Sequence, residues 1–294
     1  MDNVFAAADR FLFSQARLLE RRLFATAFLG QSGTHVIDAL RGYQNDDGGF
    51  GHGLEPDKRC PASLPIDVEI AFQAIAASGA TDVLMITRAC EFLAATAAQA
   101  GASGAVPAAF DVIEQFPRAV HWSDWTYTPA LNPTAGLAGL LYKLEFDHPW
   151  RAQATAYCWE QLAADGAITD AHTLSEVMIF LANVPDRDRA DRQAQEIAAR
   201  FADIAMFHLD PDAEGYGLTP LHLAPEAGSR WRSLFSDAQI GGHLDRLLKN
   251  QQDDGGWPIS WEPPSEAAAL EWRGIVTLQA LRTLISYGRI DAAS

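Results

Sequence analysis

The sequence predicts an all-α protein that folds as a single domain over residues 1–294, on three observations. The helical periodicity of apolar residues dominates the chain, and no segment shows sustained period-two alternation with β-branched residues. Helices that are apolar on nearly every face alternate along the chain with amphipathic helices. A glycine-rich segment near the start of the chain also recurs near its end.

Apolar periodicity and its interruptions place ten helices along the chain. We expect them over residues 5–29, 34–43, 64–78, 81–99, 131–145, 149–164, 170–183, 187–208, 236–250 and 265–287. Three segments are apolar almost all round: 66–77, 133–144 and 173–184. By contrast, 186–207 combines an apolar stripe containing Ile197 and Phe201 with many charged residues. This alternation is what two concentric rings of helices require, because inner helices contact protein on most sides.

The internal repeat joins residues 39–56, ALRGYQNDDGGFGHGLEP, to residues 246–263, RLLKNQQDDGGWPISWEP. One constant shift superimposes Gln44 on Gln251, 46–49 on 253–256, Phe50 on Trp257, and Glu55 on Glu262. Glycines in such a turn can adopt positive φ, and Asp side chains can bond nearby backbone amides. We therefore expect a structural turn whose aromatic residue packs between helix pairs and whose glutamine caps a neighbouring helix.

These two segments resemble the Q-x-x-D-G-G-W repeats of the squalene–hopene cyclase and protein prenyltransferase superfamily, in which Gln and Trp hold successive helices together. The resemblance implies a single α/α toroid, a barrel of alternating inner and outer helices. It also implies a terpenoid-cyclase-like or prenyltransferase-like protein. Because the motif belongs to the scaffold, it does not identify a reaction.

The acidic motif of class II terpenoid cyclases has a partial counterpart here. In that class, the middle carboxylate of D-x-D-D, at the start of a buried helix, protonates an alkene or epoxide. Residues 65–71 (PIDVEIA) also head a buried helix, where Asp67 and Glu69 fill the first and third positions and Ile70 replaces the last acid. Glu69 lies deeper in the apolar segment and is the first candidate for a general acid, since burial raises the pKa of a carboxyl. For either acid, the alternative is an interaction with the helix dipole.

The motifs for metal-dependent chemistry are absent from the sequence. Two glycines follow Asp46 and Asp47, so the D-D-x-x-D motif of class I terpene synthases is not formed. Prenyltransferases bind zinc through Asp, Cys and His, and Asp57 and Cys60 lie close together without a third ligand that can be placed. We therefore expect neither a metal nor a cofactor.

Four long loops lead into the inner helices, where toroids place their pockets: 50–64, 101–130, 209–235 and 257–265. Their polar and aromatic residues either line a pocket or pack the loops over the mouth of the barrel. The candidates for substrate binding in and beside these loops are His52, Trp122, Trp125, Asn132, Trp261, Glu262, Trp272 and Arg273. Glu55 is a third candidate acid, or else Glu55 and Glu262 cap matching loops. His172 and Glu176, four residues apart, are expected to share a helix face and to bond to each other.

Composition limits the partners of the protein. Its 294 residues are 48% hydrophobic, enough for one large core, and its net charge of −16 at pH 7 makes nucleic acid an unfavourable partner. Three scattered cysteines indicate a reducing compartment. The chain start resembles no signal peptide, and no window of about 18 uncharged apolar residues exists, so we expect a cytoplasmic protein without a transmembrane segment.

Three functions are compatible with these residues. A small, metal-independent cyclase or isomerase would protonate a hydrophobic, isoprenoid-type substrate in a deep cavity lined by aromatic residues. A carbohydrate-active hydrolase or lyase would instead have an open polar groove with two carboxyls roughly 5–10 Å apart. A non-catalytic binding protein that retains the scaffold would have a shallow or filled central cavity and no carboxyl with a strongly raised pKa.

Overall fold

The computed structural model describes residues 3–164 and 166–292, and within these ranges the protein is all-helical, with isolated β-bridges and no strand. This confirms the predicted class. The α-helices are α1 Val4–Gln15, α2 Leu18–Phe28, α3 Thr34–Leu40, α4 Pro65–Ser78, α5 Val83–Gln99, α6 Leu131–Lys143, α7 Pro149–Leu162, α8 Ala171–Asn183, α9 Arg187–Ala198, α10 Pro220–Leu223, α11 Asp237–Lys249 and α12 Glu266–Ser286. Short 3₁₀ helices, among them Asp111–Gln115 and Val120–Trp122, interrupt the longer loops.

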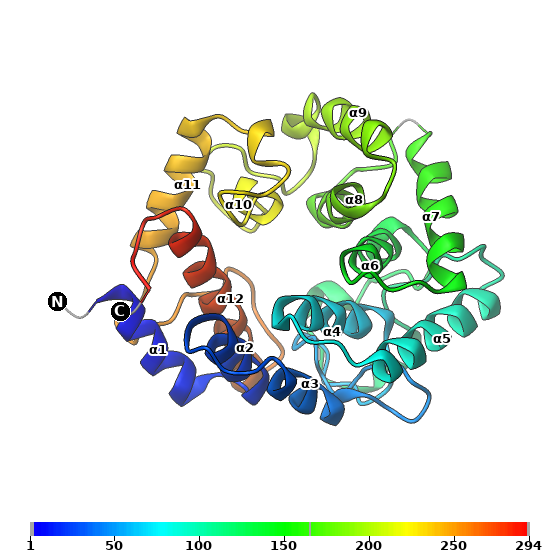
Figure 1. Cartoon of the computed structure of the whole chain (residues 1–294), viewed down its shortest axis with the longest axis horizontal. Helices are drawn as coiled ribbons and strands as arrows, with labels where there is room; N and C mark the ends of the chain where they lie inside the picture. The colour runs from blue at the N-terminus through cyan, green and yellow to red at the C-terminus, as the bar shows by residue number, and fades with distance from the viewer. Residues whose placement is uncertain (1–2, 165, 293–294) are drawn as a thin grey trace.

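The helices follow one another around the molecule, and the last helix, α12, returns to the side of α1 (Figure 1). The even-numbered helices lie nearer the middle of this view, and the odd-numbered helices lie toward its outside. Helix α6 packs against both α4 and α8, and α1 packs against α12. The first and last long helices are therefore neighbours in space.

Helix α4 shows how the sequence produces a buried helix. It begins with Pro65, which tolerates this position because its missing N–H would have no helical partner, and it ends before Gly79 in the left-handed conformation. Its buried residues lie on all faces and include Val68, Phe72 and Ile75. Helix α9 differs as expected, with its buried residues confined to one stripe: Ala190, Ala194 and Ile197.

The two glycine-rich turns have the same geometry. In each turn the glutamine amide donates one hydrogen bond within the turn and one to the first turn of an outer helix: Gln44 to the carbonyls of Gly48 (2.9 Å) and Met85 (3.0 Å), and Gln251 to those of Gly255 (2.9 Å) and Val4 (2.9 Å). Gly48 and Gly255 both have φ of +91°. A Cβ on either glycine would lie within 2.4 Å of a carbonyl oxygen of an outer helix, which only glycine avoids. The predicted structural role of this motif is confirmed.

Two helix boundaries differ from the prediction because tertiary contacts break a continuous helical pattern. The expected helix 5–29 is two helices, since Ala16 and Arg17 are extended and Arg17 turns to bond Glu20 and the carbonyl of Leu54. The expected helix 187–208 ends at Ala198. Beyond this helix, Ala205 instead forms a β-bridge with Asp170, in the segment that leads into α8.

The structure also shows the character of the helices and the state of the three cysteines. Within the described ranges no helix combines the length and the apolar character needed to cross a membrane. Cys60, Cys90 and Cys158 are all buried and carry free thiols. The cysteines therefore contribute to packing, and none of them forms a cross-link.

The glutamine contacts predict a specific loss of stability. Gln251→Ala leaves the carbonyl of Val4 without its side-chain donor and should lower the free energy of unfolding by about 1–3 kcal/mol, measured by urea denaturation. Gln252→Ala is the matched control, because the Gln252 amide bonds only the exposed carbonyl of Asn250. Equal losses in the two variants would show that Gln251 does not hold the first helix in place.

Candidate functional site

Residues of the four long loops meet near Asp57. The loop 50–64 pairs with the loop 101–130 through a β-bridge between Lys58 and Arg118 and through the Ala119 amide, which donates to the Asp57 carbonyl at 2.8 Å. The loop 257–265 reaches the same point through Trp261, and the loop 209–235 reaches it through Tyr216, whose ring packs edge-on to Trp261 at 5.7 Å.

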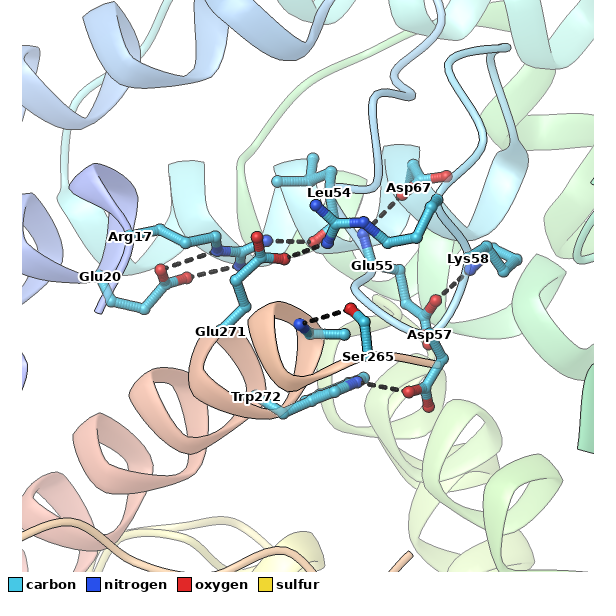
Figure 2. A network of polar contacts seen from close by, with 12 residues as sticks. Arg17, Glu20, Leu54, Glu55, Asp57, Lys58, Asp67, Ser265, Glu271 and Trp272 are labelled. Carbon is cyan, nitrogen blue, oxygen red and sulfur yellow. Dashed lines mark hydrogen bonds and ion pairs between the residues drawn. The ribbon is translucent and has the colours of Figure 1, made fainter. Parts of the chain in front are cut away.

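Two charged residues hold the loop 54–58 against the helices (Figure 2). Arg17, at the start of α2, donates to the Leu54 carbonyl at 2.8 Å and forms a two-pronged ion pair with Glu20. Asp67, in the first turn of α4, accepts the amide of Glu55 at 2.6 Å through Oδ1, while its buried Oδ2 has no partner. Burial raises the pKa of Asp67 to about 7. Asp67 therefore supports the loop that carries Glu55 and Asp57.

Glu55 and Lys58 form a buried ion pair within this loop. The Lys58 side chain is 1% exposed, and its ammonium lies 4.5 Å from the centre of the Trp122 ring. A buried ammonium needs a counter-ion, which Glu55 supplies, and the indole face adds a cation–π contact. Trp125 packs on the same indole at 4.6 Å.

Asp57 is the acid at the centre of the four loops, and within the described part of the chain no Lys or Arg forms a salt bridge with it. Its Oδ1 accepts the indole N–H groups of Trp272 at 2.8 Å and Trp261 at 3.2 Å, while Oδ2 lies 3.5 Å from Nε2 of His121. Burial, followed by the charge of Glu55, raises the pKa of Asp57 to about 7, against the lowering effect of the two indoles. Near neutral pH, Asp57 can therefore both donate and accept a proton.

The side chains around Asp57 are mostly aromatic and only partly buried. Trp261, Trp272, Tyr216 and His172 are half-buried, and the His121 side chain is 47% exposed. The rings of Trp261 and Trp272 pack edge-to-face at 5.1 Å. A buried acid thus lies behind a rim of ring faces that solvent reaches.

A second pair of acids lies between α4 and α8. The carboxyls of Glu69 and Glu176 interact with each other, Gln73 donates to Glu69 Oε1 at 2.7 Å, and burial raises the pKa of Glu69 to about 7. Burial and the charge of Glu69 raise the pKa of Glu176 well above its usual value. Gly136 of α6 makes room for this pair, because a Cβ there would lie 1.7 Å from Glu176 Oε2. We infer that the two carboxyls share one proton.

The expected hydrogen bond between His172 and Glu176 is a wrong prediction. His172 Nε2 bonds the hydroxyl of Tyr216 at 3.0 Å, and Glu176 faces Glu69. Both partners come from outside α8, so helical spacing could not identify them.

The structure brings six of the predicted site residues together around Asp57: Glu55, Asp67, Trp122, Trp125, Trp261 and Trp272. The other candidates make their contacts elsewhere. His52 is exposed and bonds Asn45 at the first glycine-rich turn, and Arg273 pairs with Asp254 at the second. Glu262 is exposed, so it does not face Glu55 across the site. Asn132 lies half-buried at the start of α6.

The sequence interpretation treated Asp57 as a possible zinc ligand and overlooked Lys58 and Tyr216. Asp57 is bonded to indoles, and among the described residues no group of three or more His, Cys, Asp or Glu side chains is arranged to hold a metal ion. The repeat contained one sequence signal that could have identified Asp57 and Lys58. Under its constant shift, Asp57 and Lys58 fall opposite Pro264 and Ser265, so both charges belong to the first copy alone.

Two surface hollows lie away from these residues. One, of about 310 Å³, lies beside α1 and α2, and another, of about 330 Å³, lies beside α7 and α9; none of the candidate residues lines either. In comparisons with known proteins, no protein-family model and no curated protein sequence matches the chain. The function is therefore inferred from the geometry of the site.

The Glu69–Glu176 pair predicts an effect of pH on stability. The folded state raises the pKa of Glu69, so it binds this proton more tightly than the unfolded chain, and stability is lost as pH rises from about 4.5 to about 7. Glu69→Gln removes that loss. We compare the free energy of unfolding of Glu69→Gln with that of the wild type at the same pH. This difference should shift in favour of the variant by on the order of 3 kcal/mol between pH 4 and pH 8.

Urea denaturation across this pH range measures the difference, and Glu160→Gln, at an exposed position on α7, is the control. Parallel pH profiles for the wild type and Glu69→Gln would contradict a shared proton.

Proposed function

We propose that the helices close into a single α/α toroid and that the loops around Asp57 cover one end of it. The inner and outer placement of alternate helices supports this arrangement (Figure 1). The repeat supports it further: Gln44 bonds α5 in the same way as Gln251 bonds α1. Helix α1 thus occupies the same position beside the second repeat as α5 occupies beside the first. This contact brings the last part of the chain next to the first.

We propose that the protein is a metal-independent cyclase or isomerase that protonates a hydrophobic, isoprenoid-type substrate. The observation that carries this proposal is Asp57, a buried carboxyl with its pKa raised to about 7 behind a rim of aromatic rings. A general acid needs a pKa near the operating pH. Buried carboxyls with raised pKa values cluster at functional sites, and this supports an enzyme.

The two oxygens of Asp57 have different roles in this proposal. Oδ1 accepts two indole N–H groups, and the proton of the neutral acid therefore resides on Oδ2. Oδ2 transfers this proton to an alkene carbon of the substrate, and the carboxylate left behind is stabilised by the same indoles. Exchange with solvent through His121, 3.5 Å from Oδ2, restores the proton.

The aromatic rim suits the carbocation that protonation of an alkene creates. Ring faces attract cations, as the position of the Lys58 ammonium over Trp122 illustrates. Because Lys58 occupies that ring, the faces left for substrate belong to Trp261, Trp272 and Tyr216.

The charges of the surrounding network favour an uncharged substrate over a diphosphate. Its three cations are each paired with a carboxylate: Arg17 with Glu20, Lys58 with Glu55, and Arg59 with Glu271. Binding a diphosphate there would require one of these pairs to break.

A carbohydrate-active hydrolase or lyase is the second candidate, favoured by one observation. Glu55 lies close enough to Asp57 for its charge to raise the pKa of that acid, so two carboxyls occupy one site beside tryptophan rings. Lys58 binds Glu55, which leaves this second carboxyl poorly placed to act as a nucleophile or base. A panel of oligosaccharides assayed alongside the isoprenoids separates the two candidates.

Removing the proton of Asp57 should abolish turnover. In a panel of isoprenoid alcohols and hydrocarbons analysed by gas chromatography, Asp57→Asn should lower kcat/KM of the active substrate by a factor of about 10²–10⁴. Circular dichroism checks that the variant is folded. Glu69→Gln, at the acid favoured by the sequence, should retain activity. The reverse pattern would assign the proton to Glu69.

The pH dependence of turnover should follow Asp57. The acid must be protonated, so activity should decline as pH rises through about 7. Trp272→Phe removes an indole N–H that stabilises the carboxylate, which raises the pKa of Asp57 and moves this decline to higher pH. Trp159→Phe, on α7 and packed against Phe180, is the control. An unmoved decline in Trp272→Phe would mean that another group limits the reaction.

A further inference from the structure

Tyr216 and His172 form a hydrogen-bonded couple beside the acid. The Tyr216 hydroxyl lies 3.0 Å from His172 Nε2, and the two rings stack at 5.8 Å with an interplanar angle of 18°. Tyr216 also packs edge-on to Trp261, which bonds Asp57. A phenol backed by an imidazole therefore lies one indole ring away from the proton donor.

The surroundings keep both members of this couple uncharged. Burial, and then the charges of Asp57 and Glu55, raise the pKa of Tyr216 to about 12, so the phenol keeps its proton. Burial lowers the pKa of His172, so its imidazole is neutral. When the phenol donates to Nε2, the ring proton of His172 resides on Nδ1.

The backbone fixes His172 and places a charge beside it. Asp170, the N-cap of α8, accepts the amides of His172 and Thr173 at 2.9 and 3.0 Å. The charges of Asp170 and Glu55 both favour the imidazolium form of His172, against the effect of burial. A proton that arrives on Nε2 would therefore meet two stabilising carboxylates.

We propose that Tyr216, with His172 behind it, is the base that ends the reaction begun by Asp57. This inference rests on the proposed function. After Asp57 has protonated one alkene carbon, the Tyr216 oxygen takes a proton from a carbon next to the cation. The electron pair of that C–H bond forms a new C=C bond, and the phenolic proton moves to His172 Nε2. One proton enters the substrate and one leaves, so the product is an isomer and no redox partner is needed.

The hydrogen bond can be tested without any substrate. In protein labelled with ¹⁵N-histidine, the His172 resonances, assigned with His172→Gln, should show a bare Nε2 and a protonated Nδ1 at pH 7. Tyr216→Phe should shift the Nε2 signal. A protonated Nε2 in the wild type would overturn the relay, because the imidazole could not then accept the phenolic proton.

The chemical role is tested on an isoprenoid that the wild type converts. Tyr216→Phe should lower kcat by a factor of about 10²–10⁴, and part of its product should be an alcohol formed when water captures the surviving cation. Tyr142→Phe, which removes a phenol bonded to Thr155 between α6 and α7, should leave rate and products unchanged.

The outcomes separate the two proposals. An active wild type whose Tyr216→Phe variant keeps the same rate and products overturns the base and leaves the acid in place. A wild type that converts no isoprenoid overturns the proposed function, and this base with it.

Discussion

The site depends on one constraint, the burial of the charged loop 55–58 at the entrance to α4. Burying a charged side chain has a large desolvation cost unless an opposite charge or a hydrogen bond offsets it. Lys58 has Glu55 as its counter-ion, the Glu55 amide bonds Asp67, and Arg17 bonds the carbonyl just before the loop. Asp57 accepts two indole N–H groups and lies 3.5 Å from an imidazole, and burial raises its pKa to about 7.

The two copies of the repeat share the glycine-rich turn but differ in the residues that follow it, and only the first copy contributes charged residues to the candidate site. Both glycine-rich turns make the same contacts to an outer helix. Beyond the turns, the first copy continues with Asp57 and Lys58, which are buried, whereas the second continues with Pro264 and Ser265, and Ser265 caps α12. The equivalent glutamates diverge accordingly: Glu55 is buried in an ion pair, and Glu262 is exposed.

Much of the fold, and the neighbourhood of the site, could be predicted from the sequence. Pro65 and Gly79 mark the ends of α4, and the aromatic content of the long loops indicated where residues would converge. The individual roles could not be predicted. Trp272 and Asp57 are 215 residues apart in sequence, and the partner of Glu69 is Glu176 on another helix, so neither contact follows from local spacing.

The sequence by itself determined the helical class, the alternation of buried and amphipathic helices, and the structural role of the DDGG turns, because each depends on local periodicity or on the conformations open to glycine. Only the tertiary structure decided which acids are neutral. The pKa of a carboxyl depends on burial and on the charges that the fold brings near it. Glu55 and Asp57, two residues apart, therefore have different partners: one binds an ammonium, and the other accepts indole N–H groups, with its pKa raised to about 7.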